Sequence, residues 1–230
     1  MRSALIIGGT GNVGQGIIDE LLKSNVTVII TSRSKDKLKE IKNKYKDKPE
    51  FIDTYQIDMS VEEEVIKLHK YIEKKYDKIN AIINSLLYTY KGKKIKDIEL
   101  SEWDTVIKNN LTSQVLIVKY LVKNLKNDGS GYLIHLNCEA NLKLLPMAIP
   151  MNVVAASLKI MYETLAIELV DEHIKVIEIL LGPIATIERI RRNVQTPFQF
   201  TPNEVGHTVL QYVNGAKPRT TIIKLVNKSK

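Results

Sequence analysis

Apolar runs alternate with amphipathic segments along almost the whole chain. The short runs are rich in Val, Ile and Leu, which predicts strands that are buried on both faces. Segments whose apolar residues recur every three or four positions predict helices that cover a sheet. The predicted strands are 3–8, 26–32, 50–58, 79–85, 131–137, 174–181 and 220–226. The predicted helices are 12–24, 35–47, 61–76, 101–126, 150–171 and 202–213.

This alternation of strand and helix predicts an α/β fold. Repeated β-α-β units form a doubly wound, Rossmann-type parallel sheet, here of about seven strands, with helices on both faces. No internal repeat, low-complexity stretch or linker interrupts the pattern, so residues 1–230 are expected to form one dinucleotide-binding domain. Residues 186–201 are the least regular part of the chain.

A glycine-rich turn, "GGTGNVGQG", joins the first predicted strand to the first predicted helix. Such a turn lets the backbone approach a pyrophosphate, and the helix N-terminus behind it offers free N–H groups to the phosphates. A strand before the glycines and a helix after them is the context that a dinucleotide site requires. A purely structural turn is the alternative. The candidate cofactor residues here are Gly8, Thr10, Gly11, Asn12, Val13 and Gly14.

The end of the second predicted strand bears on the choice of cofactor. A site selective for NAD(H) places an acidic residue there to bind the ribose hydroxyls. Ser32 and Arg33 stand at that point instead, and no acid precedes Asp36. A guanidinium matches the geometry of a phosphate, so Arg33 favours NADP(H) over NAD(H). The alternative is that Arg33 is an ordinary surface arginine.

Composition and charge limit the kinds of molecule with which the protein is expected to interact. The 230 residues carry a formal net charge of +8, but the lysines are mixed with acids and form no basic block, so we expect no nucleic-acid partner. No apolar run approaches the roughly 18 residues of a membrane helix, and we expect no membrane association. The single cysteine, Cys138, excludes an internal disulfide. Without an export signal, we expect a cytoplasmic protein with no metal site.

Several motifs, in the same order along the chain, resemble the short-chain dehydrogenase/reductase family over about residues 3–226. They are "TSRSKDKLKE", "IDMS", "INSLL", "EWDTVIKNNLTSQV", "GSGYLIHLNCEA" and "LAIELVDEHIKVIEILLGPIAT". The resemblance implies further cofactor contacts at Asp58, Met59, Asn84, Ser85, Pro183 and Thr186.

The same resemblance implies an unusual catalytic centre. Asn110 matches the family's catalytic asparagine, but Cys138, Met151 and Ala155 stand at the positions of its serine, tyrosine and lysine. The family's tyrosine donates a proton and the lysine lowers its pKa. Met151 has no proton to donate and Ala155 carries no charge, so the usual Tyr–Lys relay cannot operate.

Other side chains are candidates for a replacement proton donor. Tyr88 and Tyr90 follow the fourth predicted strand, and Glu139 directly follows Cys138. Lys159 lies one helical turn beyond Ala155. His135 is expected to point to the face of the sheet opposite Cys138. For each of these residues, packing or a solvated surface role is the alternative.

Substrate and assembly follow from the resemblance alone. Residues 186–201 match the family's substrate lid, and Arg189, Arg191 and Arg192 favour a small anionic substrate. A solvated helix face is the alternative. The helices at 101–126 and 150–171 match the family's subunit contacts, which implies a homodimer or homotetramer.

Three hypotheses remain open at this point. The protein is a non-standard NADP(H)-binding enzyme for a small molecule, or an inactive NADP(H)-binding regulatory or scaffold protein. The third hypothesis is an NADPH-dependent carbonyl reductase whose proton donor has been relocated.

Overall fold

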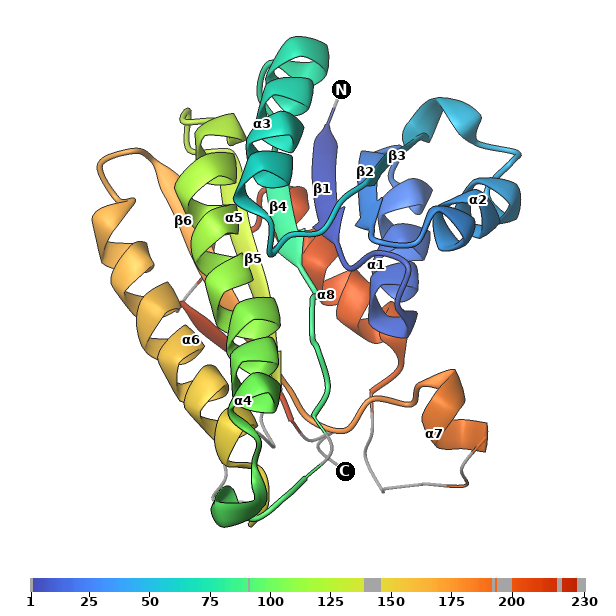
Figure 1. Ribbon diagram of the computed structural model, residues 1–230. Coiled ribbons are helices and arrows are strands. Elements are labelled where there is room, and N and C mark those ends of the chain that lie inside the picture. Colours follow the sequence, from blue (N-terminus) through green and yellow to red (C-terminus); the bar gives the residue numbers. More distant parts are fainter. Residues whose placement is uncertain are drawn as a thin grey trace.

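A parallel sheet runs through the middle of the molecule and separates two layers of helices (Figure 1). The computed structural model describes residues 2–90, 92–138, 146–191, 193, 200–218 and 221–226. Within them the strand order is β3-β2-β1-β4-β5-β6-β7. This order confirms the predicted doubly wound fold. The strands are β1 (Ser3–Ile7), β2 (Thr27–Ser32), β3 (Ile52–Gln56), β4 (Ala81–Asn84), β5 (Gly131–Cys138), β6 (Ile174–Leu181) and β7 (Ile222–Leu225).

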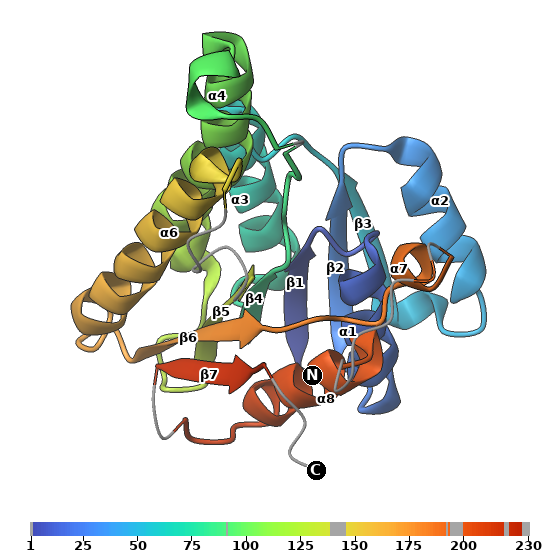
Figure 2. The ribbon, with the colours of Figure 1, turned by 90° about the horizontal axis from the view of Figure 1, so that it is seen from below.

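Each face of the sheet has its own hydrophobic core. Helices α1 (Asn12–Lys23), α2 (Lys35–Lys44) and α8 (Pro202–Val213) contribute to one core. The other core contains side chains from α3 (Glu62–Tyr76), α4 (Leu100–Ile107), α5 (Ser113–Leu121) and α6 (Ile149–Glu168). Seen along the sheet, the two helical layers lie on opposite sides of the strands (Figure 2).

Successive residues of the central strands alternate between these two cores. Leu5 and Ile7 of β1 pack on the α3/α5/α6 side, whereas Ala4 and Ile6 pack on the α1/α8 side. Both faces are therefore apolar, which is why these strands appear as continuous hydrophobic runs in the sequence.

Two predicted segments differ in detail from the structure. The helix expected over 101–126 is interrupted by a π-helical turn at Lys108–Thr112 and ends in a 3₁₀ turn at Val122–Asn124. The irregular segment at 186–201 begins with a short helix, α7 (Ile187–Arg191). A π turn inserts one extra residue into a helical turn, which periodicity does not reveal.

Within the part of the chain that the structure describes, none of the helices combines the length and apolar character that crossing a membrane requires.

Candidate functional site

A cavity of about 340 Å³ opens at the carboxyl ends of β1, β2 and β4. The chain crosses from β1 to β2 in one direction and reaches β4 on the other side of β1, so this is the switch point of the sheet. Ligands of open α/β sheets bind at such a point. The lining residues are Ile7, Gly8, Thr10, Gly11, Thr31, Ser32, Arg33, Ser34, Lys37, Ile57, Asp58, Met59, Ser60, Ser85, Leu86, Leu87, Asn109 and Ser113.

The glycine turn forms one wall of this cavity. Gly8 has a φ of +78°, a conformation that glycine adopts without strain, and its carbonyl accepts a hydrogen bond from Gly11 N at 3.0 Å. A Cβ on Gly14 would lie 2.6 Å from the Gly8 carbonyl oxygen, so glycine is required for helix α1 to begin this close to β1. Gly11 caps α1 without a side-chain hydrogen bond. The first N–H groups of α1 thus remain available for phosphate oxygens.

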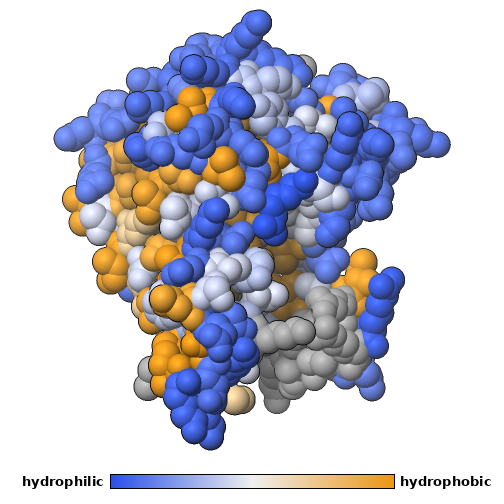
Figure 3. Space-filling view, viewed as in Figure 1, coloured by the Kyte–Doolittle hydropathy of each residue, from blue (hydrophilic) through white to orange (hydrophobic). Residues whose placement is uncertain are grey.

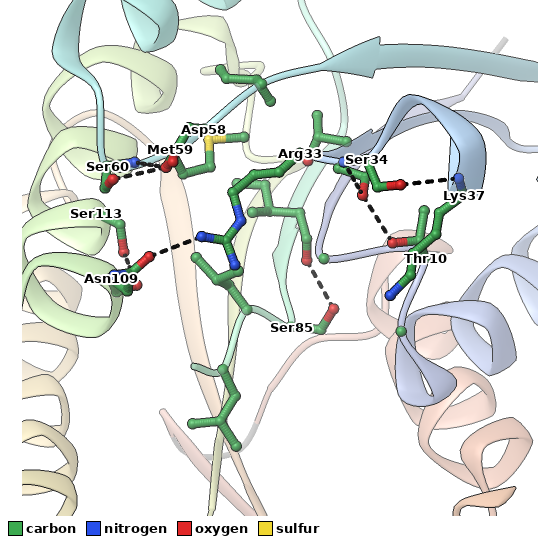
Figure 4. Close-up of a pocket in the computed structure, with 18 residues that line it drawn as sticks. Thr10, Arg33, Ser34, Lys37, Asp58, Met59, Ser60, Ser85, Asn109 and Ser113 are labelled. Carbon is green, nitrogen blue, oxygen red and sulfur yellow. Dashed lines mark hydrogen bonds between the residues drawn. The ribbon is translucent and has the colours of Figure 1, made fainter. Parts of the chain in front are cut away.

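Two basic side chains that follow β2, Arg33 and Lys37, form the basic wall of the cavity. The Arg33 guanidinium extends across the cavity and donates a hydrogen bond from Nη1 to Asn109 Oδ1 at 3.2 Å (Figure 4). Lys37 lies on the other side, beside Thr10. Thr10 and Ser32 are joined by an Oγ1–Oγ hydrogen bond of 3.1 Å, which ties the glycine turn to the end of β2.

An ionised carboxylate stands at the third side of the cavity. Asp58 Oδ1 accepts hydrogen bonds from Ser60 N at 2.9 Å and from Ser60 Oγ at 2.7 Å. Burial acts to raise the pKa of Asp58, but the two Ser60 hydrogen bonds and the charges of Arg33 and Lys108 outweigh it, so the pKa lies below its ordinary value. The carboxylate can therefore accept a hydrogen bond from a ligand amino group at neutral pH.

The structure brings eight of the fourteen expected cofactor residues to the lining of this cavity. Those that line it are Gly8, Thr10, Gly11, Ser32, Arg33, Asp58, Met59 and Ser85. Asn12 lines an adjoining cleft, and Val13 and Gly14 lie in the first turn of α1. Asn84 is fully buried at the end of β4. Pro183 and Thr186 lie after β6 and are not among the lining residues.

Asn110 is engaged with the backbone of Tyr88. Its Oδ1 accepts the Tyr88 N–H at 2.8 Å, and its Nδ2 donates to the Tyr88 carbonyl at 2.9 Å. The π turn presents Asn110 to the loop after β4. Asn110 therefore fixes this loop. In the same loop, the Tyr90 hydroxyl is buried and has no hydrogen-bond partner among the described residues.

The positions matching the family's tyrosine and lysine lie in the core. Met151 and Ala155, in the first half of α6, are 7% and 1% exposed. Cys138 is half-buried at the end of β5. Lys159 forms an ion pair with Glu163 at 2.8 Å. Glu139, Arg192 and the side chain of Arg189 lie outside the described residues.

A row of buried polar side chains lies beneath α6. Asn84, His135 and Glu178 are register partners on β4, β5 and β6. The His135 ring stacks on Tyr162 of α6, with ring centroids 4.2 Å apart and an interplanar angle of 5°. Burial lowers the pKa of His135 to about 3, so the ring is neutral. Burial also raises the pKa of Glu178, against the Asn137 hydrogen bond and the charge of Lys159.

Asn137 connects this row to the catalytic positions. Its Nδ2 donates to Glu178 Oε1 at 2.9 Å and to the Ala155 carbonyl at 3.3 Å, and its Oδ1 accepts the Cys138 N–H at 2.8 Å. The sequence analysis considered His135 but missed Asn137 and Glu178. Their signal was polar residues at alternate positions of otherwise apolar strands, which indicates side chains sharing one face.

In the described ranges, no cluster of three or more His, Cys, Asp or Glu side chains is placed to hold a metal ion.

Comparisons with known proteins agree with the fold and identify the family. The family described as short chain dehydrogenase matches residues 2–195. An uncharacterized oxidoreductase of Staphylococcus aureus (strain MRSA252) is 24% identical over 210 residues, covering 91% of this chain and 89% of that protein. Two solved structures are similar in fold. ElxO with NADP bound has a TM-score of 0.88 at 21% identity, covering 98% of this chain and 97% of that one. The other is a short chain oxidoreductase from Pseudomonas aeruginosa PAO1, described as containing an atypical catalytic center. It has a TM-score of 0.87 at 15% identity, and the match covers 98% of this chain and 95% of that one.

Proposed function

Because the chain belongs to the short-chain dehydrogenase family, we propose that it is an oxidoreductase that binds NADP(H) in preference to NAD(H). It acts on a small molecule without the Tyr–Lys proton relay. The proposal is supported by eight of the fourteen cofactor residues expected from the sequence, among them Gly8, Arg33 and Asp58, which line one cavity. ElxO, similar in fold, was solved with NADP bound, which is consistent with the same cofactor here.

The observation that carries the cofactor preference is the basic wall at the end of β2. Arg33 and Lys37 line the cavity there. Asp36, the first acid after β2, is absent from the lining, and its side chain is 88% exposed. The wall therefore suits a ribose phosphate better than free ribose hydroxyls.

In the proposed reaction, the cofactor and the protein side chains have different roles. Bound NADPH would supply a hydride. The residues of this chain would hold the dinucleotide through the glycine turn and Arg33, and would position a substrate beside it. Met151 contributes no proton, so Tyr88, Tyr90 and Glu139 are the proposed sources of one. Among these, the Tyr90 hydroxyl is buried and has no hydrogen-bond partner within the described ranges, which supports the alternative of a carbonyl reductase with a relocated donor.

A protein that binds NADP(H) without turnover is the second candidate. Both polar ends of the Asn110 amide are occupied by Tyr88, and Met151 and Ala155 are packed into the core. Such a site would report the NADP(H) state to a partner, with no substrate.

A binding titration tests the proposal. We expect NADPH to bind at least about tenfold more tightly than NADH, because a charge-assisted arginine–phosphate hydrogen bond contributes roughly 1.5–3 kcal/mol. Arg33→Ala should remove most of this preference and leave NADH affinity nearly unchanged. The measurement is the dissociation constant of each nucleotide, from quenching of the protein's fluorescence.

The matched control is Arg2→Ala, since Arg2 lies beside Asn80 and Lys126, away from the glycine turn. It should bind both nucleotides like the unmodified protein. Equal affinities for NADPH and NADH in the unmodified protein would contradict the preference. No binding of either would reject a dinucleotide site altogether.

A further inference from the structure

We propose that the cleft between α1, α2 and α7 is a second part of the cofactor site, and that it binds the ribose 2′-phosphate of NADP(H) between Lys37 and Arg191. This inference rests on the proposed NADP(H) preference. It assigns the phosphate to a residue of the segment that follows β6, in addition to the residues that follow β2.

The cleft is built from three helices that are distant in sequence. Asn12 and Gln15 come from α1, Lys37 and Lys44 from α2, and Arg191 from the last position of α7. Figure 1 and Figure 2 both show α7 on the α1/α2 side of the molecule, away from α6. The cleft has a volume of about 630 Å³, enough to admit a phosphate group.

The charges in this cleft are not balanced internally. Lys44 already faces Asp19 at 3.4 Å and donates to Gln15 Oε1 at 3.2 Å. The Lys37 ammonium and the Arg191 guanidinium have no ion-pair or hydrogen-bond partner among the residues that the structure describes. Among the described residues, Glu40 is the one acid in the lining, and it is exposed to solvent. Within that part of the chain, the cleft thus presents two cations without an ion-pair partner to an incoming anion.

The cleft is continuous with the dinucleotide cavity. Thr10 and Lys37 line both. Figure 4 shows Lys37 and Thr10 on the side of the cavity opposite Asp58, while Arg33 crosses the middle toward Asn109. A ribose phosphate beside Lys37 would lie where the two cavities meet, with Arg33 on the side of the first cavity and Arg191 on the side of the second.

Arg191 adds a planar guanidinium to the ammonium of Lys37, and the two groups differ in how they bind a ribose 2′-phosphate. A phosphate monoester carries a charge of about −1.5 to −2 at neutral pH, and a guanidinium can bind two of its oxygens at once. Lys37 acts as a point charge, so the paired cations would hold the phosphate from two sides. NADH has no 2′-phosphate, so it would gain nothing from Arg191.

The test is a titration of the full-length protein and its Arg191→Ala variant with NADPH and NADH. We expect the variant to bind NADPH about tenfold more weakly and NADH as tightly as before. Arg191→Lys should recover part of the loss, since it keeps the charge without the planar fork. Lys39→Ala is the matched control, because Lys39 lies on α2, carries the same charge and pairs with Asp36 away from the cleft. It should leave both affinities unchanged.

Hydrogen exchange gives an independent readout. At equal saturation, NADPH should protect the amides of 187–191 more than NADH does. An Arg191→Ala variant with unchanged NADPH affinity, in a protein that prefers NADPH, would overturn this inference alone. Equal weakening for both nucleotides would also overturn it, by placing Arg191 on the shared pyrophosphate. If the unmodified protein shows no preference for NADPH, that result rejects the proposed NADP(H) preference, and this inference is rejected with it.

Discussion

At the scale of the residue, two titratable side chains, His135 and Glu178, are buried where water cannot solvate their charged forms. His135 is 1% exposed, and both ring nitrogens lack hydrogen-bond partners among the described residues. Glu178, its neighbour on β6, is fully buried, with Oε2 also without a partner in that part of the chain. An unpaired buried polar group is costly, and an unpaired buried charge far more so. The His135 ring should therefore remain neutral in the folded protein well below its ordinary pKa, and burial raises the pKa of Glu178.

This predicts an acid-sensitive core. The folded-state pKa of His135, about 3, lies below its ordinary value of 6.5. The stability that depends on the neutral ring is complete above about pH 6.5 and is lost as the pH falls toward 3, at up to about 1.4 kcal/mol per pH unit. His135→Phe should abolish this part of the pH dependence, as measured by urea unfolding at a series of pH values.

The exposed His207 supplies the control. His207→Phe should show the same acid loss as the unmodified protein, because its ring is in solvent. If His135→Phe lost stability between pH 6.5 and 4 as steeply as the unmodified protein, the histidine would not be the cause.

At the scale of the element, helix α6 carries the two positions on which the proposed chemistry depends. It presents Met151, Val154, Ala155, Leu158 and Tyr162 to the core. The resemblance stated from the sequence aligns Met151 and Ala155 with the family's proton donor and its lysine, and we propose that the reactive groups are absent from this helix. Whether only those groups are missing can be tested directly.

The double variant Met151→Tyr with Ala155→Lys should acquire slow NADPH oxidation with simple ketones if the rest of the site is intact. The new tyrosine would donate the proton and the new lysine would lower its pKa. Both positions are buried, so we expect a loss of stability of roughly 1–3 kcal/mol. The measurement is the decrease in NADPH absorbance with a ketone panel.

The control is Met151→Phe with Ala155→Lys, which has the aromatic ring but no hydroxyl. Activity confined to the tyrosine variant would show that only donors are missing. A folded tyrosine variant that binds NADPH but reduces no ketone would indicate that the substrate pocket has diverged, and would favour the binding role.

At the scale of the whole molecule, an apolar stripe remains uncovered. Val153, Ile160 and Ile167 recur every seven residues along α6 and are 39%, 60% and 76% exposed. Val115 of α5 is 47% exposed. The space-filling view shows hydrophobic surface over the α5/α6 side (Figure 3). A seven-residue spacing places side chains on one face of a helix, and exposed apolar patches mark interaction sites. This supports the proposed homodimer or homotetramer.

We predict that Ile160→Glu weakens self-association at least about tenfold, because a carboxylate replaces a side chain whose burial contributes roughly 1.5–3 kcal/mol. Sedimentation velocity over a range of concentrations measures the effect. Ile190→Glu on α7, also strongly exposed, should leave assembly unchanged. If the unmodified protein stays monomeric at high concentration, the homodimer or homotetramer expected from the family resemblance is contradicted.

The sequence by itself determined the order of strands and helices and the glycine turn, and its motifs led to the prediction of altered catalytic positions. These features depend on residues close together in the chain, such as alternation within a strand or the spacing from Gly8 to Gly14, and on motifs that keep their order. The fold was predictable for that reason. The π turn was not, because one inserted residue leaves the apolar period almost unchanged.

Only the tertiary structure decided which distant residues meet. It directed Arg33 to Asn109, engaged Asn110 with Tyr88, aligned Asn84, His135 and Glu178 across three strands, and set Arg191 in a cleft with Lys37. Each of these arrangements depends on the packing of whole elements and on strand register. Lys37 and Arg191 are 154 positions apart in the chain, so no local sequence pattern indicates that they lie in the same cleft.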